Sequence, residues 1–133
     1  MKKLFDVQKA IYQRINTDDG VKERVNGIFD AVPDESRFPY IVLGRFFLTP
    51  YITKTSKGWQ IEQTIDVWSA KKGKEETIGI IDSIKRALER EKLSIDGAYV
   101  VSHEIKSIEI LEEEIDLFHG TFIYESIIDV EGF

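Results

Sequence analysis

The chain contains two histidines, His103 and His119, and these are the first side chains to consider for catalysis or metal binding. Both fall in strand-like stretches near the C-terminus, where they could face each other. A metal site would need a third ligand, which Glu104 or Asp116 could supply. Histidines on strands are more often ordinary polar residues, and no third ligand stands at a recognisable spacing. We therefore expect no metal site, no cofactor and no catalytic histidine.

Two charged segments contain the residue types of a metal-dependent nuclease. PDESR (residues 33–37) supplies a proline followed by an aspartate, and EIK (residues 104–106) supplies a Glu-x-Lys triplet. In such enzymes two carboxylates hold magnesium and a lysine assists the attacking water. A long stretch separates the two segments here, and matches this short are frequent by chance. A polar turn and a solvated strand edge explain them better.

The Gly-Lys pair of AKKGKEET (residues 70–77) is shared with phosphate-binding loops. Such loops need a further glycine earlier and a serine or threonine directly after the lysine, but Trp68 and Glu75 occupy those positions. The segment instead predicts a turn and a helix start, because the negative charges of Glu75 and Glu76 interact favourably with the dipole at a helix N-terminus. Since no serine, cysteine or histidine has a recognisable nucleophile setting, we predict that the protein is not an enzyme.

Composition and net charge narrow the class of protein further. A length of 133 residues, with 42% hydrophobic and 32% charged residues, predicts a single folded domain over residues 1–133. The absence of cysteine excludes disulfides. A net charge of −6 disfavours sequence-specific nucleic-acid binding, because the molecule repels phosphates. Without a long apolar window or a signal-like N-terminus, we expect a soluble protein made in the cytoplasm, with no membrane partner.

Two stretches have the period of amphipathic helices, residues 3–15 and residues 75–91. Their apolar positions recur at steps of three and four: Leu4, Val7, Ile11 and Ile15 in the first, and Ile78, Ile81, Ile84 and Leu88 in the second. Asp18 or Asp19 can cap a short helical turn that follows the first stretch.

Five stretches read as strands, and together with the helices they predict the fold. Residues 27–32 predict a short strand stopped by Pro33. Residues 40–47 are apolar without alternation, as in a strand covered on both faces, and we interpret them as a central or an interface-covered strand. Residues 59–69 alternate, with Trp59, Ile61, Ile65 and Val67 on one face. Residues 99–110 and 117–130 complete the set. The expected fold is α+β, a mostly antiparallel sheet with two amphipathic helices packed on one face.

Two connections are candidates for contact with a partner. We expect the segment Arg45–Gly58 (RFFLTPYITKTSKG) to be a mobile connection that orders on docking, because it holds aromatic residues among threonines and lysines. The alternative is a hairpin whose aromatics fold back onto the core. The acidic LEEEID (residues 111–116) is the second candidate, or else a solvated turn. The candidate contact residues are Arg45, Phe46, Phe47, Tyr51, Ile52, Lys54, Lys57, Glu112, Glu113 and Glu114.

Several segments, taken in order, point to a known family. They are LFDVQKAIYQRI, GIFDAVPDESRFPYIVLG, TIDVWS, IGIIDSIKRALE and FHGTFIYESIIDV. This series resembles the tail-completion family of long-tailed bacteriophages, also called tail-to-head joining proteins, over nearly the whole chain. The most specific pieces are DAVP with FPYIVLG, and DVWS followed by a helix.

The resemblance implies a non-enzymatic structural protein of a phage or prophage. Such a protein caps the tail tube and joins the tail to the head-closure complex as a ring, expected to be a hexamer. The implied partners are further copies of this chain, the tail tube protein and the head-closure or neck protein. The implied location is the virion tail or neck, after assembly in the host cytoplasm. The alternative is a small α+β ligand-binding or regulatory domain that dimerises through its sheet.

Overall fold

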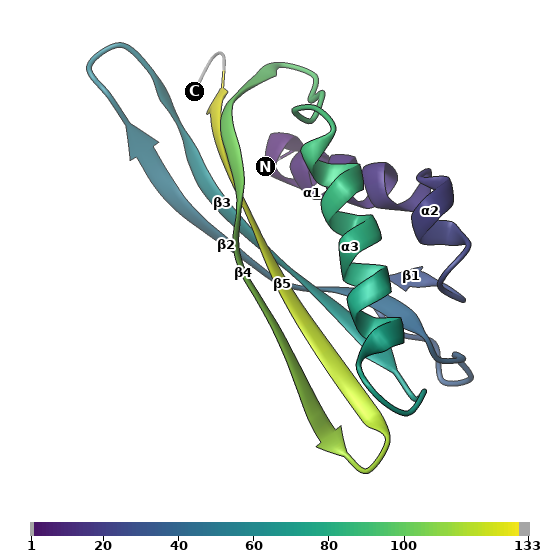
Figure 1. Cartoon of the computed structure of the whole chain (residues 1–133). Helices are drawn as coiled ribbons and strands as arrows, with labels where there is room; N and C mark the ends of the chain where they lie inside the picture. The colour runs from purple at the N-terminus through teal and green to yellow at the C-terminus, as the bar shows by residue number, and fades with distance from the viewer. Residues whose placement is uncertain (1, 131–133) are drawn as a thin grey trace.

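The computed structural model describes residues 2–130 and places helices on one face of a five-stranded sheet (Figure 1). The helices are α1 (Lys2–Asn16), α2 (Asp19–Lys22) and α3 (Glu75–Glu89). The strands are β1 (Ile28–Phe29), β2 (Tyr40–Ile52), β3 (Lys57–Ser69), β4 (Ala98–Glu114) and β5 (Leu117–Val130). The predicted α+β class, with a mostly antiparallel sheet and helices on one face, is confirmed.

The sheet has the strand order β1-β2-β3-β5-β4. Only the short β1 pairs in parallel, with β2, and the remaining neighbours are antiparallel. The chain forms the hairpin β2–β3, crosses the sheet through α3, and returns as the hairpin β4–β5, with β5 between β3 and β4. Strands of 13 to 17 residues are long compared with the usual length of about 5–6 residues.

The hydrophobic core lies between the helices and the face of the sheet that they cover. From the helices, Ile11 and Ile84 are fully buried in it, and from the strands, Ile65 and Phe122 are fully buried. Gly120 on β5 allows α3 to approach closely, because a Cβ there would lie 2.6 Å from Cδ1 of Ile81 and 2.9 Å from Cγ2 of Thr77. The apolar stripe predicted for α1 is confirmed at Val7, Ile11 and Ile15.

The predicted stripe of α3 is wrong at one position. Ile78 is 52% exposed, whereas Thr77 is fully buried. The helix presents Thr77, Ile80, Ile84 and Leu88 to the core, because residues spaced by three and four share a face and Ile78 lies outside that arc. The helix also ends at Glu89, two residues before the predicted end.

The alternation predicted for residues 59–69 is confirmed, with one addition. Ile61, Ile65 and Val67 of β3 are buried on the helix face. Gln63 on the same face is also fully buried, and its Nε2 donates to the carbonyl oxygen of Thr64 at 2.8 Å. Its hydrogen bonds satisfy the amide, so a polar residue fits within the apolar row.

Within the described chain, residues 40–47 are covered on one face alone, so this chain does not supply the predicted cover on both faces, and cover by an interface stays a prediction. Ile41 and Leu43 are buried beneath the helices, but Tyr40 and Val42 are half-buried on the opposite face. That face carries no helix among the described elements (Figure 1). We call it the open face of the sheet.

The expectation of a long connection over Arg45–Gly58 is also wrong. β2 continues to Ile52 and β3 begins at Lys57, so the turn comprises residues 53–56. Aromatic and β-branched residues favour a strand here, and Pro50 is tolerated because β1 pairs with β2 only at Ile41 and Val42, which leaves the rest of β2 an edge. In the same way β4 continues through the predicted acidic turn to Glu114.

Candidate interaction surfaces

The two histidines lie at separate places on the sheet and do not form a common site. In the β4–β5 pairing, His103 lies opposite Ser126 and His119 lies opposite Leu111. Within residues 2–130, no group of three or more His, Asp or Glu side chains has an arrangement that could hold a metal ion. A metal site built from both histidines is therefore not formed.

His103 makes a structural contact with a buried tyrosine. Its Nδ1 lies 2.8 Å from the hydroxyl of Tyr124. Burial lowers the pKa of His103, and the nearby charges of Lys92 and Arg14 lower it further. Burial also raises the pKa of Tyr124 to about 12. Both groups are thus favoured in their neutral forms, which suits a stable hydrogen bond.

His119 links three strands on the open face. Its Nε2 lies 2.7 Å from Oδ1 of Asp66 on β3, and its Nδ1 lies 2.9 Å from Oε1 of Glu113 on β4. The ring stacks on Trp68 with centroids 4.0 Å apart. Burial alone would lower the pKa of His119, but the hydrogen bonds to Glu113 and Asp66 outweigh it and raise the pKa. The cluster fastens the end of the β4–β5 hairpin to β3.

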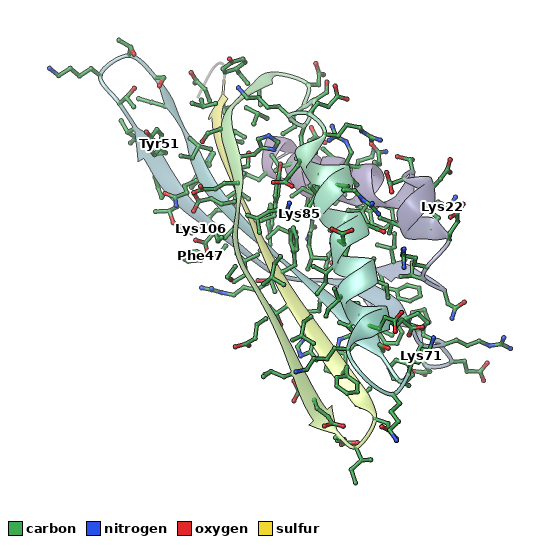
Figure 2. All side chains as sticks on the ribbon, viewed as in Figure 1. Lys22, Phe47, Tyr51, Lys71, Lys85 and Lys106 are labelled. Atoms are coloured by element: carbon green, nitrogen blue, oxygen red, sulfur yellow. The ribbon has the colours of Figure 1, made fainter. Side chains whose placement is uncertain are left out.

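The hairpins form projections at opposite ends of the sheet (Figure 1). At one end the β2–β3 hairpin extends past β5. The pairing of β3 with β5 begins at Gly58, so Lys57 and the turn before it lie beyond β5. At the other end the β4–β5 hairpin extends past β3, whose last pairing is Ser69 with Phe118. We call residues 51–57 the basic tip and residues 111–117 the acidic tip. Figure 2 shows Tyr51 at the start of the basic tip and Phe47 nearer the middle of the sheet.

The basic tip has an ordered turn with unpaired lysines. Within the turn, the backbone N–H of Thr53 donates to the carbonyl oxygen of Ser56 at 2.9 Å, and the two hydroxyls lie 2.8 Å apart. Lys54 and Lys57 make no ion pair with any residue that the structure describes. Ile52 beside them is 64% exposed. A cavity of about 360 Å³ lies between this turn and the end of β5.

The residues below the basic tip divide between the two faces of the sheet. Phe46 is half-buried against the core, so the alternative of an aromatic folding back onto the core applies to this residue. Phe47 is 45% exposed, and the guanidinium carbon of Arg45 lies 4.4 Å from the centre of its ring. Of the predicted contact residues on this hairpin, Phe46 is therefore the one that serves the core.

The acidic tip combines carboxylates with exposed aliphatic residues. Oε2 of Glu112 accepts a hydrogen bond from the backbone N–H of Asp116 at 3.1 Å, and Glu113 contacts His119 as described above. The carboxylates of Glu114 and Asp116 have no partner within residues 2–130. Ile115 at the turn is 92% exposed. The predicted acidic residues are thus all at one end of the sheet, facing solvent.

A row of carboxylates crosses the middle of the open face, and sequence reasoning missed it. Glu62 on β3 and Glu104 on β4 both lie directly opposite Glu125 on the central strand β5. Glu125 is only 6% exposed, and its Oε2 accepts a hydrogen bond from Nε2 of Gln60 at 2.7 Å and lies 3.5 Å from Nζ of Lys106. These contacts offset the repulsion expected between like charges on neighbouring strands. The row depends on strand register, which no local pattern reveals.

The outer edge of β4 is the second long free edge of the sheet. Free edges can accept a strand from another chain. β4 has three register irregularities along its pairing with β5, and it carries charged residues such as Glu104 and Lys106. Bulges and charges of this kind hinder indiscriminate edge pairing. Contacts through this edge would therefore need a specific partner.

Within residues 2–130, no helix is long and apolar enough to cross a membrane. The chain is 24% identical over 107 residues to the tail completion protein gp17 of Bacillus phage SPP1, which covers 80% of this chain and 79% of that protein.

Two solved structures share the fold. A chain from the virion of a native gene transfer agent particle matches with a TM-score of 0.83 and 20% identity, over 92% of this chain and 94% of that chain. The structure of the bacteriophage SPP1 gp17 protein matches with a TM-score of 0.65 and 22% identity, over 95% and 91%. The sequence profile of the family described as tail completion protein gp17 matches residues 9–129, so this chain belongs to the family of phage tail completion proteins.

Proposed function

We propose that this protein closes the finished tail tube and joins the tail to the head-closure complex, without an enzymatic step. In this proposal residues 1–133 act as one tail-completion-like domain, and copies of the chain assemble as a ring, expected to be a hexamer. The ring contacts the tail tube protein on one side and the head-closure or neck protein on the other. It resides in the virion tail or neck after assembly in the host cytoplasm.

The family match over residues 9–129 is the observation that carries this proposal, because it extends from α1 into β5 and includes both hairpins. The gene transfer agent chain, whose fold matches over 94% of its length, is described as part of a virion particle. Both observations favour a place in a particle over the alternative of a ligand-binding or regulatory domain that dimerises through its sheet.

The structure offers exposed surfaces suited to a ring component. Helices and one sheet face form the core, while the open face and both tips leave large side chains in solvent. Interfaces favour aromatic and aliphatic residues surrounded by polar ones. The proposed contact residues are Arg45, Phe47, Tyr51, Ile52, Lys54, Lys57, Glu112, Glu113 and Glu114.

Deletion of the gene from the phage or prophage that encodes this chain tests the proposal. Heads and tails should accumulate separately in negative-stain micrographs, and addition of purified protein to such an extract should produce joined particles. A strain that still assembles joined particles without the protein would rule this role out. An extract that receives buffer alone is the matched control.

A further inference from the structure

The two tips carry opposite charge at opposite ends of one sheet. The basic tip contains Lys54 and Lys57 and no acidic residue. The acidic tip contains Glu112, Glu113, Glu114 and Asp116 and no basic residue. Some charges of the other sign lie beside the tips. Asp129 lines the cavity at the basic tip, and His119 contacts Glu113 at the acidic tip. The lysines of the β3–α3 connection, Lys71, Lys72 and Lys74, follow the end of β3. The charge difference between the tips remains.

Each tip also exposes aliphatic surface beside its charges. Ile52 is 64% exposed at the basic tip, and Ile115 is 92% exposed at the acidic tip, with Leu111 at 49%. A charged rim around an apolar centre is the usual composition of a protein interface. The two tips are therefore complementary in charge and in apolar surface. Their charges are opposite, and each tip has an exposed aliphatic side chain that the other could bury.

We propose that the basic tip of one copy binds the acidic tip of the next copy, so that copies of this chain join head to tail. In this contact Lys54 and Lys57 face Glu114 and Asp116, whose carboxylates have no partner within residues 2–130 of their own chain. Ile115 packs beside Ile52. The inference rests on the proposed function, because it names the contact through which the ring closes.

A head-to-tail contact has a geometric consequence. Because two different patches meet at every junction, the contact can repeat from copy to copy, and it gives a closed ring where the rotation between neighbours closes and an open filament where it does not. A self-complementary patch would instead stop at a dimer. The tips lie at opposite ends of the sheet, so one copy can use both at the same time, as a repeating contact requires. The contact also weakens with salt, since its charges are exposed.

Charge exchange between the tips provides the test. Variant A carries Lys54→Glu and Lys57→Glu, and variant B carries Glu112→Lys, Glu114→Lys and Asp116→Asn. Asparagine is chosen at position 116 because the backbone there has φ of 59°, which asparagine tolerates. Glu113 is retained because it holds His119. A control variant carries Lys9→Glu and Lys22→Glu, two exposed lysines in the helices.

Assembly is measured by sedimentation velocity and native mass spectrometry at low and high salt. We expect wild-type protein and the control variant to form rings, and variants A and B each to lose self-association by at least about tenfold in dissociation constant. An equimolar mixture of A and B should form rings again, because each junction then pairs opposite charges. These mixed rings should contain equal numbers of A and B.

Three results would overturn the contact. The first is that variants A and B assemble like wild type. The second is that the mixture of A and B fails to assemble although both variants keep wild-type melting curves. The third is that wild-type protein stays monomeric at low salt. Joining of heads and tails is scored in the same samples. If particles are joined by variants that assemble normally, the proposed function stands and the tip contact fails. If wild-type protein itself cannot join particles, the proposed function fails.

Discussion

The centre of the sheet and its two tips use the same strands in different ways. At the centre, Ile65 of β3 is fully buried beneath the helices. Toward the basic tip, the same strand begins at Lys57, which is exposed and makes no ion pair within the described chain. Removal of buried side chains is costly, whereas exposed ones contribute little to folding. Stability is therefore concentrated at the centre, and the tips remain available for contacts with other chains.

The largest expected effect is in the centre. Ile65→Ala or Ile84→Ala should lower the free energy of unfolding by about 2–5 kcal/mol, because each leaves a cavity in a fully buried site. Ile78→Ala on the same helix is the matched control, and it should cost less than about 1 kcal/mol because Ile78 is 52% exposed. Urea unfolding followed by circular dichroism measures all three. Equal losses for Ile78 and Ile84 would show that the covered face is assigned wrongly.

A second effect at the centre concerns the close approach of α3 to β5. Gly120→Ala should destabilise by about 1–3 kcal/mol, because the added methyl group meets Ile81 and Thr77. Gly79→Ala in α3 is a useful contrast. Its methyl group meets only the flexible side chain of Arg24, and alanine favours a helix, so it should be neutral or stabilising by up to about 1 kcal/mol. Thermal unfolding of both variants compares them directly, and a harmless Gly120→Ala would refute the close packing.

The sequence predicts the centre well because its patterns are local. Alternation at Ile61, Ile65 and Val67, and helical spacing at Val7, Ile11 and Ile15, each reflect one covered face, and these residues are buried. The prediction that Ile78 faces the core is wrong because spacing alone does not separate it from Thr77. Both residues stand three or four positions from Ile81, and the more polar Thr77 is the buried one. Local patterns thus identify the element correctly and its exact face less well.

The candidate surfaces are less predictable because they depend on distant partners. Thr53 to Ser56 form a turn because the residues on both sides pair along two long strands. The mixed polar and aromatic residues of those strands give no clear alternation that would predict the pairing. Glu62, Glu104 and Glu125 form a row through register across three strands. The acidic tip was predicted from a local run of charge, although Glu112 to Glu114 belong to β4 and not to a turn.

A smaller effect lies at the junction of centre and acidic tip. The pKa of His119 is raised in the folded protein, so its contribution to stability is fully present below the unfolded pKa and is lost as pH rises through the folded pKa. His119→Gln should therefore cost more at pH about 5.5 than at pH about 8.5, by less than about 1 kcal/mol because the site is partly solvated. Urea unfolding at both pH values measures the difference.

His103→Gln is the internal control for that pH dependence. The pKa of His103 is lowered in the folded protein, so its contribution is present above the unfolded pKa and is lost as pH falls. The two variants should therefore show opposite trends with pH. If both trends have the same sign, the contacts of His119 with Asp66 and Glu113 do not control its charge.

The smallest effect on folding should come from the acidic tip itself. Ile115→Ser should change the free energy of unfolding by less than about 0.5 kcal/mol, because the side chain is 92% exposed. Urea unfolding beside wild-type protein measures this. A loss comparable to that of Ile65→Ala would mean that the tip takes part in the core and would break the comparison between centre and tip.

The most direct test combines folding and joining in one variant of the β2–β3 hairpin. Phe47→Ser with Tyr51→Ser removes two half-exposed aromatic rings, 45% and 39% exposed, and leaves the covered face untouched. Its melting curve is recorded, and the variant is added to an extract of separate heads and tails, where joined particles are counted by negative-stain microscopy. We predict near-wild-type melting together with heads and tails that remain separate. A variant that folds normally and joins particles as well as wild-type protein would contradict the account.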